Sequence, residues 1–400
     1  SIARRPSEPA VTASPALNPL VAAVAAPPVA EAAAWRAAYD GRGGAMIDMA
    51  QAAPGYPPHA SILAGLAQAA GAPATAPYGV IPGDPKLREV YAAHVAALYS
   101  APVAADEIAI TTGCNMAFVA VAMAVAQRGD AILVPTPWYF NHDMTLSMLG
   151  VEPRPLPCRA QEGFLPSVAA AEALIDDRTR AILLVTPNNP TGAIYPPALI
   201  ADFARLCARR GLWLILDETY RDFLETQPPH GELAGPERGR VMQLYSFSKA
   251  YCIPGHRLGA ILAPRDAIPH IVKILDCLHI CPPRAGQAML PAAIGKLGAW
   301  REANRREIAA RADAFKAALA GSGWRIDSIG AYFAFVAHPF AGTDALDVSR
   351  ALARDLGVIT LPGPFFGEGY ATHLRFAFAN ADVAAIAQVG RRLAAWRGPN

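Results

Sequence analysis

Six short runs of apolar residues lie between residues 107 and 262, and each is long enough for one buried strand. Helix-like patterns lie between some of them, at residues 115–126 and 197–210, and after the last of them, at residues 268–278. Strands that are apolar throughout are typical of a sheet covered on both faces, and alternation with helices favours parallel connections. The pattern therefore predicts an α/β protein with a mostly parallel sheet. The expected strands are residues 107–110, 131–134, 181–185, 213–216, 241–245 and 258–262.

The alternation of apolar strands and helices ends at about residue 295. A long charged helix pattern at residues 298–319 precedes strand-like pieces at 331–336 and 373–378 and a closing helix pattern at 382–396. This order predicts a second, smaller α+β domain. The first 35 residues are rich in Ala and Pro and favour a flexible arm. The expected parts are an arm over residues 1–45, a large α/β domain over 60–295, and a small domain made of 46–59 and 296–400.

Composition narrows the classes of partner. The chain has 400 residues with a formal net charge of +2, and it lacks the runs of Lys and Arg that mark nucleic-acid binding. Prolines interrupt the apolar stretch near the start, which argues against a secretory signal, and residues 21–26 are too few to span a membrane. No Cys or His spacing matches a zinc site. We therefore expect a cytoplasmic protein without metal, membrane or nucleic-acid partners, with an organelle transit peptide as the alternative for the arm.

Polar residues follow four of the expected strands directly. In open α/β sheets, ligands bind beyond the carboxyl ends of the strands, so these residues are candidates for one site. The four segments are Thr111-Thr112-Gly113-Cys114-Asn115, Pro135-Thr136-Pro137-Trp138-Tyr139, Thr186-Pro187-Asn188-Asn189 and Asp217-Glu218-Thr219-Tyr220.

Each segment has a structural and a functional interpretation. The turn at Gly113 can point backbone N–H groups at an anion, or it can simply begin a helix. Tyr139 can stack on a heteroaromatic ring or pack in the core. Asn189 can hydrogen-bond a phenolate oxygen or shape an ordinary turn. Asp217 ends an apolar strand, so its carboxylate needs a partner such as a protonated pyridine nitrogen, unless it caps a helix. Tyr220 can reach a ring hydroxyl.

The most informative segment runs from Ser246 to Gly259 and contains Ser248, Lys249 and Arg257. A primary amine forms an imine with an aldehyde, whereas hydroxyls and a guanidinium hold a phosphate. An aldehyde together with a phosphate describes pyridoxal 5′-phosphate (PLP). Taken alone, Lys249 would be interpreted as a solvated surface lysine.

Together these motifs resemble those of the class I/II aminotransferases, fold type I PLP enzymes similar to aspartate aminotransferase, over about residues 45–390. The resemblance implies a mostly parallel seven-stranded sheet sandwiched by helices, a smaller α+β domain and PLP as cofactor. It implies that Lys249 bonds to PLP and carries the substrate Cα proton, that Asp217 pairs with the pyridine nitrogen and that Tyr139 stacks on the ring. Asn189 and Tyr220 would bind the ring oxygen. The phosphate would be held by Gly113, Cys114, Asn115, Ser246, Ser248 and Arg257, and by Tyr78 of a neighbouring subunit, which implies a homodimer.

The resemblance also implies a substrate site. Arg375 matches the arginine that binds the substrate α-carboxylate, with Asn189 beside it. Ala52 stands where the family has a glycine whose backbone meets the same carboxylate, which puts the local backbone angle in doubt. His142 replaces a family tyrosine, and we expect it to be a surface or core histidine, with an orientation into the substrate pocket as the alternative.

The side chain of the substrate is less constrained. The arginine that binds acidic side chains in the aspartate-specific branch is missing from residues 273–280, which disfavours acidic substrates. Arg284 lies just beyond and is a candidate substitute, whereas Asp276 would favour a cationic side chain if it lines the pocket.

The residues support three hypotheses. The first is an aminotransferase that moves an amino group between an L-amino acid and a 2-oxo acid by a ping-pong mechanism. The second is a PLP enzyme that performs β-elimination, decarboxylation, cyclisation or oxidation, because all these reactions begin from the same bound state. The third is a transcription regulator with a PLP-binding domain, but such proteins add a DNA-binding module, and the first 45 residues contain no helix-turn-helix pattern.

Overall fold

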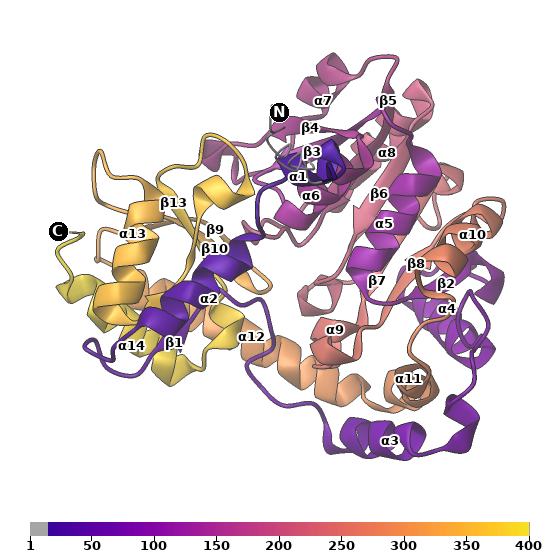
Figure 1. Ribbon diagram of the computed structural model, residues 1–400, viewed down its shortest axis with the longest axis horizontal. Helices are drawn as coiled ribbons and strands as arrows, with labels where there is room; N and C mark the ends of the chain where they lie inside the picture. The colour runs from indigo at the N-terminus through magenta and orange to yellow at the C-terminus, as the bar shows by residue number, and fades with distance from the viewer. Residues whose placement is uncertain (1–14, 400) are drawn as a thin grey trace, which may run out of the picture.

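The computed structural model describes residues 15–399, and a seven-stranded sheet lies at the centre of its larger part (Figure 1). The strand order is β2-β8-β7-β6-β5-β3-β4, and only the pairs that involve β8 are antiparallel. The expected mostly parallel α/β sheet is therefore confirmed. The strands are β2 (Ile108–Thr111), β3 (Ala131–Thr136), β4 (Glu152–Pro157), β5 (Thr179–Val185), β6 (Trp213–Asp217), β7 (Val241–Ser246) and β8 (Gly259–Leu262).

Both faces of this sheet are buried, which explains why its strands are apolar throughout. In β5, Ile182 and Leu184 pack into one apolar cluster, and Leu183 and Val185 pack into another on the opposite face. The second cluster contains residues of α5 (Cys114–Val125), α6 (Phe140–Leu149) and α10 (Ile268–His279). The first contains residues of α3 (Ala60–Ala70), α4 (Pro85–Tyr99), α7 (Val168–Leu174), α8 (Pro197–Arg210), α9 (Phe247–Ala250) and α11 (Arg284–Lys296).

The edge strand β4 was not expected from the sequence, because prolines occupy three of its six positions. These prolines alternate with Glu152, Arg154 and Leu156, so the backbone nitrogens of all three prolines point to the same edge of the strand. That edge points away from β3, the single neighbour of β4 in the sheet, so the missing N–H donors cost no hydrogen bond between the strands.

A four-stranded antiparallel sheet forms the smaller part of the molecule, which is yellow and orange in Figure 1. Its order is β12 (Leu361–Pro362), β13 (His373–Phe376), β10 (Phe333–Ala337) and β9 (Arg325–Gly330). The expected long and closing helices are present as α12 (Gly298–Leu319) and α14 (Val383–Ala395), together with a shorter α13 (Ala345–Ala351). The parallel pair of β1 (Ile47–Asp48) and β11 (Val358–Ile359) joins residues near the start of the chain to this part.

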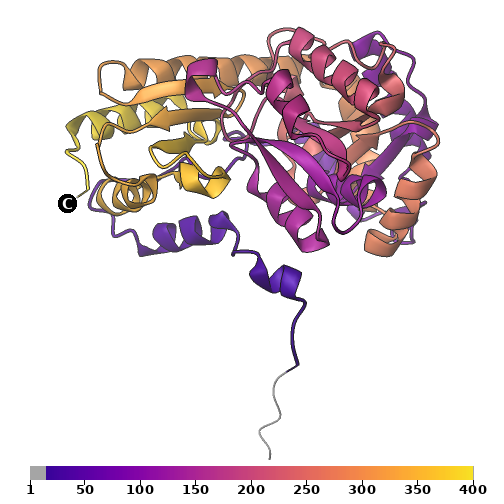
Figure 2. The ribbon, with the colours of Figure 1, turned by 90° about the horizontal axis from the view of Figure 1, so that it is seen from above.

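The N-terminal region differs from the expected flexible arm over the residues that the structure describes. It forms α1 (Pro19–Ala23) and α2 (Pro28–Ala38), whose prolines occupy the first helical turn, where a missing N–H costs nothing. Figure 2 shows α1 projecting from the body, whereas α2 lies along the smaller part. α1 packs against α6, and α2 packs against β11. Residues 1–14 of the expected arm lie outside the described residues.

Within residues 15–399, we find no helix that combines the length and the apolar character needed to cross a lipid bilayer.

Candidate active site

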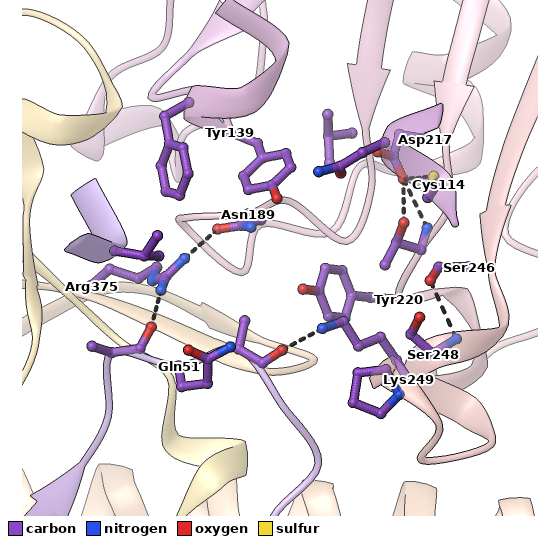
Figure 3. A pocket seen from close by; sticks show the side chains of 18 of the residues that line it. Gln51, Cys114, Tyr139, Asn189, Asp217, Tyr220, Ser246, Ser248, Lys249 and Arg375 are labelled. Carbon is purple, nitrogen blue, oxygen red and sulfur yellow. Dashed lines mark hydrogen bonds between the residues drawn. The ribbon is translucent and has the colours of Figure 1, made fainter. Parts of the chain in front are cut away.

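Twelve of the fourteen site residues predicted from the sequence line one cavity at the carboxyl edge of the large sheet (Figure 3). Strands β2, β3, β5, β6 and β7 all end at this edge, and the segments that follow them begin there. Arg257 precedes β8, which is antiparallel, so its position is at the same edge. The twelve residues are Ala52, Cys114, Asn115, Tyr139, Asn189, Asp217, Tyr220, Ser246, Ser248, Lys249, Arg257 and Arg375.

Lys249 lies in the one-turn helix α9, directly after β7. The hydroxyl of Ser246 caps this helix by accepting a 3.3 Å hydrogen bond from the Ser248 N–H group. The Lys249 ammonium donates a hydrogen bond to the backbone carbonyl of Ala52. Burial lowers the pKa of Lys249 to about 8, and the nearby Arg375 adds to the effect. The amine is therefore available in its neutral, nucleophilic form near neutral pH.

Asp217 is the buried carboxylate of the site. Burial would raise its pKa, but His142 and Thr219 hold the pKa below its ordinary value. His142 Nε2 lies 3.3 Å from Oδ2, and the hydroxyl and N–H of Thr219 donate to Oδ1 at 2.7 and 3.0 Å. An ionised carboxylate in this position can pair with a protonated pyridine nitrogen.

An anion cradle lies in the same cavity, around the start of helix α5. Gly113 is the N-cap residue of the 12-residue helix α5, with φ of +81°, and a Cβ there would stand 2.2 Å from the Arg257 guanidinium. Only glycine therefore lets this guanidinium approach the N-terminus of the helix. The Ser248 hydroxyl is buried and has no hydrogen-bond partner within the described residues. A guanidinium, an unpartnered hydroxyl and a helix N-terminus are donors that suit a phosphate.

Arg375 occupies the side of the cavity formed by the smaller part. Its guanidinium donates to Asn189 Oδ1 at 2.9 Å and to the Ala50 carbonyl, and the rings of Phe333 and Phe366 lie 4.9 and 5.2 Å from it. Its Nε is buried and has no partner among the described residues. Burial lowers its pKa to about 10, so the guanidinium stays charged at neutral pH. It is therefore prepared for an anionic ligand such as a carboxylate.

The donor set of the cavity fits PLP. The cradle around Gly113 suits the phosphate, the carboxylate of Asp217 suits the pyridine nitrogen, and the amine of Lys249 suits the aldehyde. The buried hydroxyl of Tyr220 and the amide of Asn189 are available for the ring oxygen, because both side chains line the same cavity.

Sequence reasoning missed several residues of the site. His142 is a buried histidine, as one interpretation held, but its contact with Asp217 was not foreseen. Thr219 could have been found, because a hydroxyl two residues after an Asp often closes a turn onto it. Val29 and Phe140 also line the cavity, and no local pattern singled them out.

Other predicted residues lie outside the cavity. Gly113 shapes the cradle but does not itself line the cavity, and Tyr78 is 78% exposed on the surface. Arg284 donates to the carbonyls of Pro77 and Ala74, and Asp276 is exposed on α10. Neither of these two side chains lines the cavity of its own chain.

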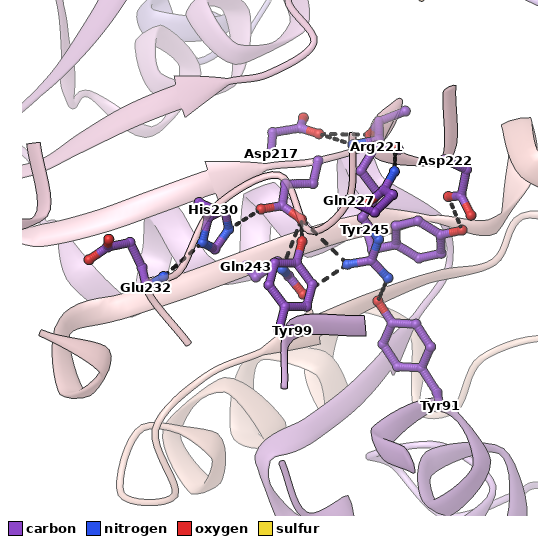
Figure 4. Close-up of polar contacts among 12 residues, drawn as sticks. Tyr91, Tyr99, Asp217, Arg221, Asp222, Gln227, His230, Glu232, Gln243 and Tyr245 are labelled. Carbon is purple, nitrogen blue, oxygen red and sulfur yellow. Dashed lines mark hydrogen bonds and ion pairs between the residues drawn. The ribbon is translucent and has the colours of Figure 1, made fainter. Parts of the chain in front are cut away.

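The residue after Asp217 carries a second buried carboxylate, and a polar cluster surrounds it (Figure 4). Glu218 accepts hydrogen bonds from Tyr99, from His230 and, at 2.8 Å, from Gln243. The Nδ1 atom of His230 accepts a hydrogen bond from the Glu232 N–H group, which leaves Nε2 to donate to Glu218.

Arg221 is the cation that balances Glu218. Its Nη1 lies 3.4 Å from the Glu218 carboxylate, its Nη2 donates to Tyr91 at 3.1 Å, and its guanidinium lies 4.1 Å from the ring centroid of Tyr245. The side chain is 1% exposed. Each of the two consecutive carboxylates therefore has its own partners.

Comparison with known proteins agrees with this arrangement. Residues 45–393 match the family described as aminotransferase class I and II. An arginine–pyruvate transaminase of Pseudomonas aeruginosa is 30% identical over 309 residues, or 74% of this chain and 77% of the relative. A valine–pyruvate aminotransferase of Mycobacterium tuberculosis is also 30% identical, over 80% of this chain and 83% of the relative. A solved single mutant of the aspartate aminotransferase of Thermus thermophilus superposes with a TM-score of 0.88 at 22% identity, over 95% of this chain and 99% of that chain.

The chain belongs to the class I and II aminotransferase family. It is a PLP-dependent aminotransferase, whose substrates are an amino acid and a 2-oxo acid.

Proposed function

We propose that Lys249, Asp217 and Tyr220 are the catalytic residues of a ping-pong transamination between an L-amino acid and a 2-oxo acid. The observation that carries this proposal is the buried Lys249 amine, with its pKa lowered to about 8, between an anion cradle and an ionised carboxylate. The cradle residues, from Gly113 to Asn115 together with Ser246, Ser248 and Arg257, hold the phosphate. Tyr139 stacks on the ring, and Asn189 and Tyr220 bind its oxygen.

When bound, PLP supplies a positively charged ring that withdraws electrons from the substrate Cα. Asp217 stays ionised and keeps the ring nitrogen protonated, and His142 and Thr219 fix its orientation. Arg375 binds the substrate carboxylate in two parallel hydrogen bonds, next to Asn189 and the backbone at Ala52. The Lys249 Nζ atom then takes the proton from the substrate Cα and would deliver it to the C4′ carbon of the cofactor.

A half-reaction with single amino acids tests this function. Each donor is added to the PLP-loaded enzyme without a 2-oxo acid, and conversion of the cofactor to its amine form is followed by its visible absorbance. Transamination requires this conversion and the release of the matching 2-oxo acid. Spectral changes with several donors, but no amine form with any of them, would instead support the β-elimination, decarboxylation, cyclisation or oxidation alternative.

The variant Arg375→Ala tests the substrate carboxylate site. It removes two charge-assisted hydrogen bonds of about 1.5–3 kcal/mol each, so kcat/KM for amino donors is expected to fall by about 10²- to 10⁴-fold. PLP absorbance should remain, because Arg375 is assigned to the substrate. Arg306→Ala is the control, since the Arg306 side chain is 70% exposed and pairs only with Glu302 among the described residues. Equal losses in both variants would contradict the assignment.

We propose that two copies form a homodimer in which Tyr78 of one subunit reaches the phosphate cradle of the other. Tyr78 is 78% exposed, and Val80, Leu278 and Ile280 are exposed by 51%, 39% and 45%. The Gly79 N–H group donates to Cys281 Sγ at 3.3 Å, so the two segments lie side by side. Exposed apolar side chains gathered in this way are typical of an interface.

Sedimentation measures the size of this assembly directly. We expect twice the 42.1 kDa mass of the chain. Tyr78→Phe is expected to weaken PLP binding without changing the mass, because it removes only the hydroxyl. A stable monomer that binds PLP normally would contradict the shared site.

The two sheets support a proposed division into a large domain over residues 60–295 and a small domain made of 46–59 and 296–400. Ile47 and Met49 pack in the same apolar cluster as Phe376, which supports the assignment of residues 46–59. A fragment of residues 60–295 that folds by itself would support this boundary. We also propose a cytoplasmic location, for which cell fractionation is the test.

A further inference from the structure

Most residues that line the active-site cavity are assigned above to a part of the cofactor or to the substrate carboxylate, and a smaller set of lining residues has no assignment. The three cations, Lys249, Arg257 and Arg375, are assigned to the aldehyde, the phosphate and the substrate carboxylate. The carboxylate of Asp217 is assigned to the ring nitrogen. Among the described residues of one subunit, no charged lining residue is left for the side chain of a substrate.

The remainder near Arg375 is mostly apolar. Phe366 lies 5.2 Å from the Arg375 guanidinium, and the ring of Phe140 lies 6.0 Å from that of Phe366. Phe140 and Val29, from helix α2, both line the cavity. These two side chains, Phe140 buried and Val29 41% exposed, form an apolar wall of the cavity that holds Arg375.

A second groove lies behind this wall. It has a volume of about 1450 Å³, compared with about 210 Å³ for the active-site cavity. Helices α1 and α2 border it on one side, and Trp138, Met144 and Phe365 line it on the other. Phe140 is the one residue that lines both spaces within the described chain, so its side chain separates them.

Phe140 is held firmly in this position. Its side chain is only 6% exposed, and its ring lies 5.0 Å from that of Tyr139. The backbone around it is tied to the opposite wall, because the Trp138 N–H group donates to the Phe366 carbonyl at 2.8 Å. A side chain packed in this way acts as a fixed wall.

We propose that Phe140, together with Val29, sets the length of the substrate side chain, and that the enzyme takes amino acids with short, uncharged, apolar side chains. This inference rests on the proposed transamination. In a ping-pong reaction, donor and acceptor use the same cavity in turn, so the same wall limits the side chain of the 2-oxo acid. Within the described residues of its own subunit, a charged side chain would find no charged partner, which is unfavourable in a buried site.

A series of straight-chain donors tests the role of Phe140. Alanine, 2-aminobutyrate, norvaline, norleucine and 2-aminooctanoate are compared in the unmodified enzyme and in Phe140→Ala. Each methylene newly buried in the groove is worth roughly fourfold in binding. Phe140→Ala is therefore expected to raise the ratio of kcat/KM for 2-aminooctanoate to that for 2-aminobutyrate by roughly tenfold or more.

Phe365→Ala is the matched control, because Phe365 lines the groove but not the active-site cavity. It should leave the ratio unchanged. If Phe140→Ala does not fold, Phe140→Val carries the same test with a smaller truncation. An unchanged ratio in the folded Phe140 variant, or arginine or aspartate as the best donor of the unmodified enzyme, would overturn the proposal.

Binding of unreactive carboxylates separates this inference from the proposed reaction. Propionate, hexanoate and octanoate are titrated into the PLP-loaded enzyme by calorimetry, and only Phe140→Ala should gain affinity as the chain lengthens. If no donor converts the cofactor to its amine form, the proposed transamination fails, while the carboxylate series still decides the role of Phe140. Tight binding of octanoate to the unmodified enzyme would refute it.

Discussion

Lys249→Ala is expected to lower kcat/KM for every amino donor by about 10³- to 10⁴-fold, because it removes the group that carries the Cα proton. The protein should still bind PLP through the phosphate cradle and Asp217, but without a covalent bond. Borohydride reduction followed by mass spectrometry measures that bond, and steady-state kinetics measure the activity. Lys296→Ala is the control, since Lys296 is exposed at the end of α11. A Lys249→Ala enzyme with normal turnover would refute the assignment.

The lowered pKa of Lys249 adds a pH dependence to this result. The neutral amine is the form that attacks an aldehyde, so the rate of PLP attachment to the apoenzyme should rise as the pH increases and level off above about 8. An ordinary lysine, with a pKa of 10.5, would continue to gain rate well beyond that point. Stopped-flow absorbance between pH 6 and 10 distinguishes the two profiles. A rate that still rises steeply at pH 10 would contradict the effect of burial.

Arg221→Ala is expected to reduce the free energy of unfolding by about 3–5 kcal/mol, because it leaves the buried Glu218 carboxylate without its cation. The variant also removes the hydrogen bond to Tyr91 and the contact with the ring of Tyr245. Urea unfolding of the apoprotein at a fixed protein concentration provides the comparison. Arg306→Ala, which breaks an exposed ion pair with Glu302, should cost less than about 1 kcal/mol.

A double variant separates the lost charge from the lost packing. Arg221→Met with Glu218→Gln removes both charges while keeping much of the volume, so it should be more stable than Arg221→Ala. A loss in Arg221→Ala no larger than that of the exposed control would show that Glu218 does not need its cation. Equal losses in Arg221→Ala and the double variant would attribute the effect to packing.

The sequence and the structure agree where local residue patterns determine an element, and they differ where contacts between distant elements determine it. Strand order aside, the apolar runs predicted the strands to within two residues, because a buried strand needs an apolar side chain on both faces. The prediction failed at β4, where prolines concealed a strand that only its edge position allows. The arm also differed, because α1 and α2 pack on α6 and β11, which are distant in the sequence.

By itself, the sequence determined which residues carry chemistry. Gly113 and Lys249 lie within three residues of the end of a strand and Asp217 is the last residue of one, so their position depends on local structure that their own neighbours specify. The tertiary structure decided which distant side chains meet them. His142 reaches Asp217 through the placement of α6, and Val29 of α2 and Phe140 of α6 line the same cavity although they are far apart in the sequence. Such contacts depend on how separate elements pack, which no local periodicity encodes, and for that reason the length of the substrate pocket became visible only in three dimensions.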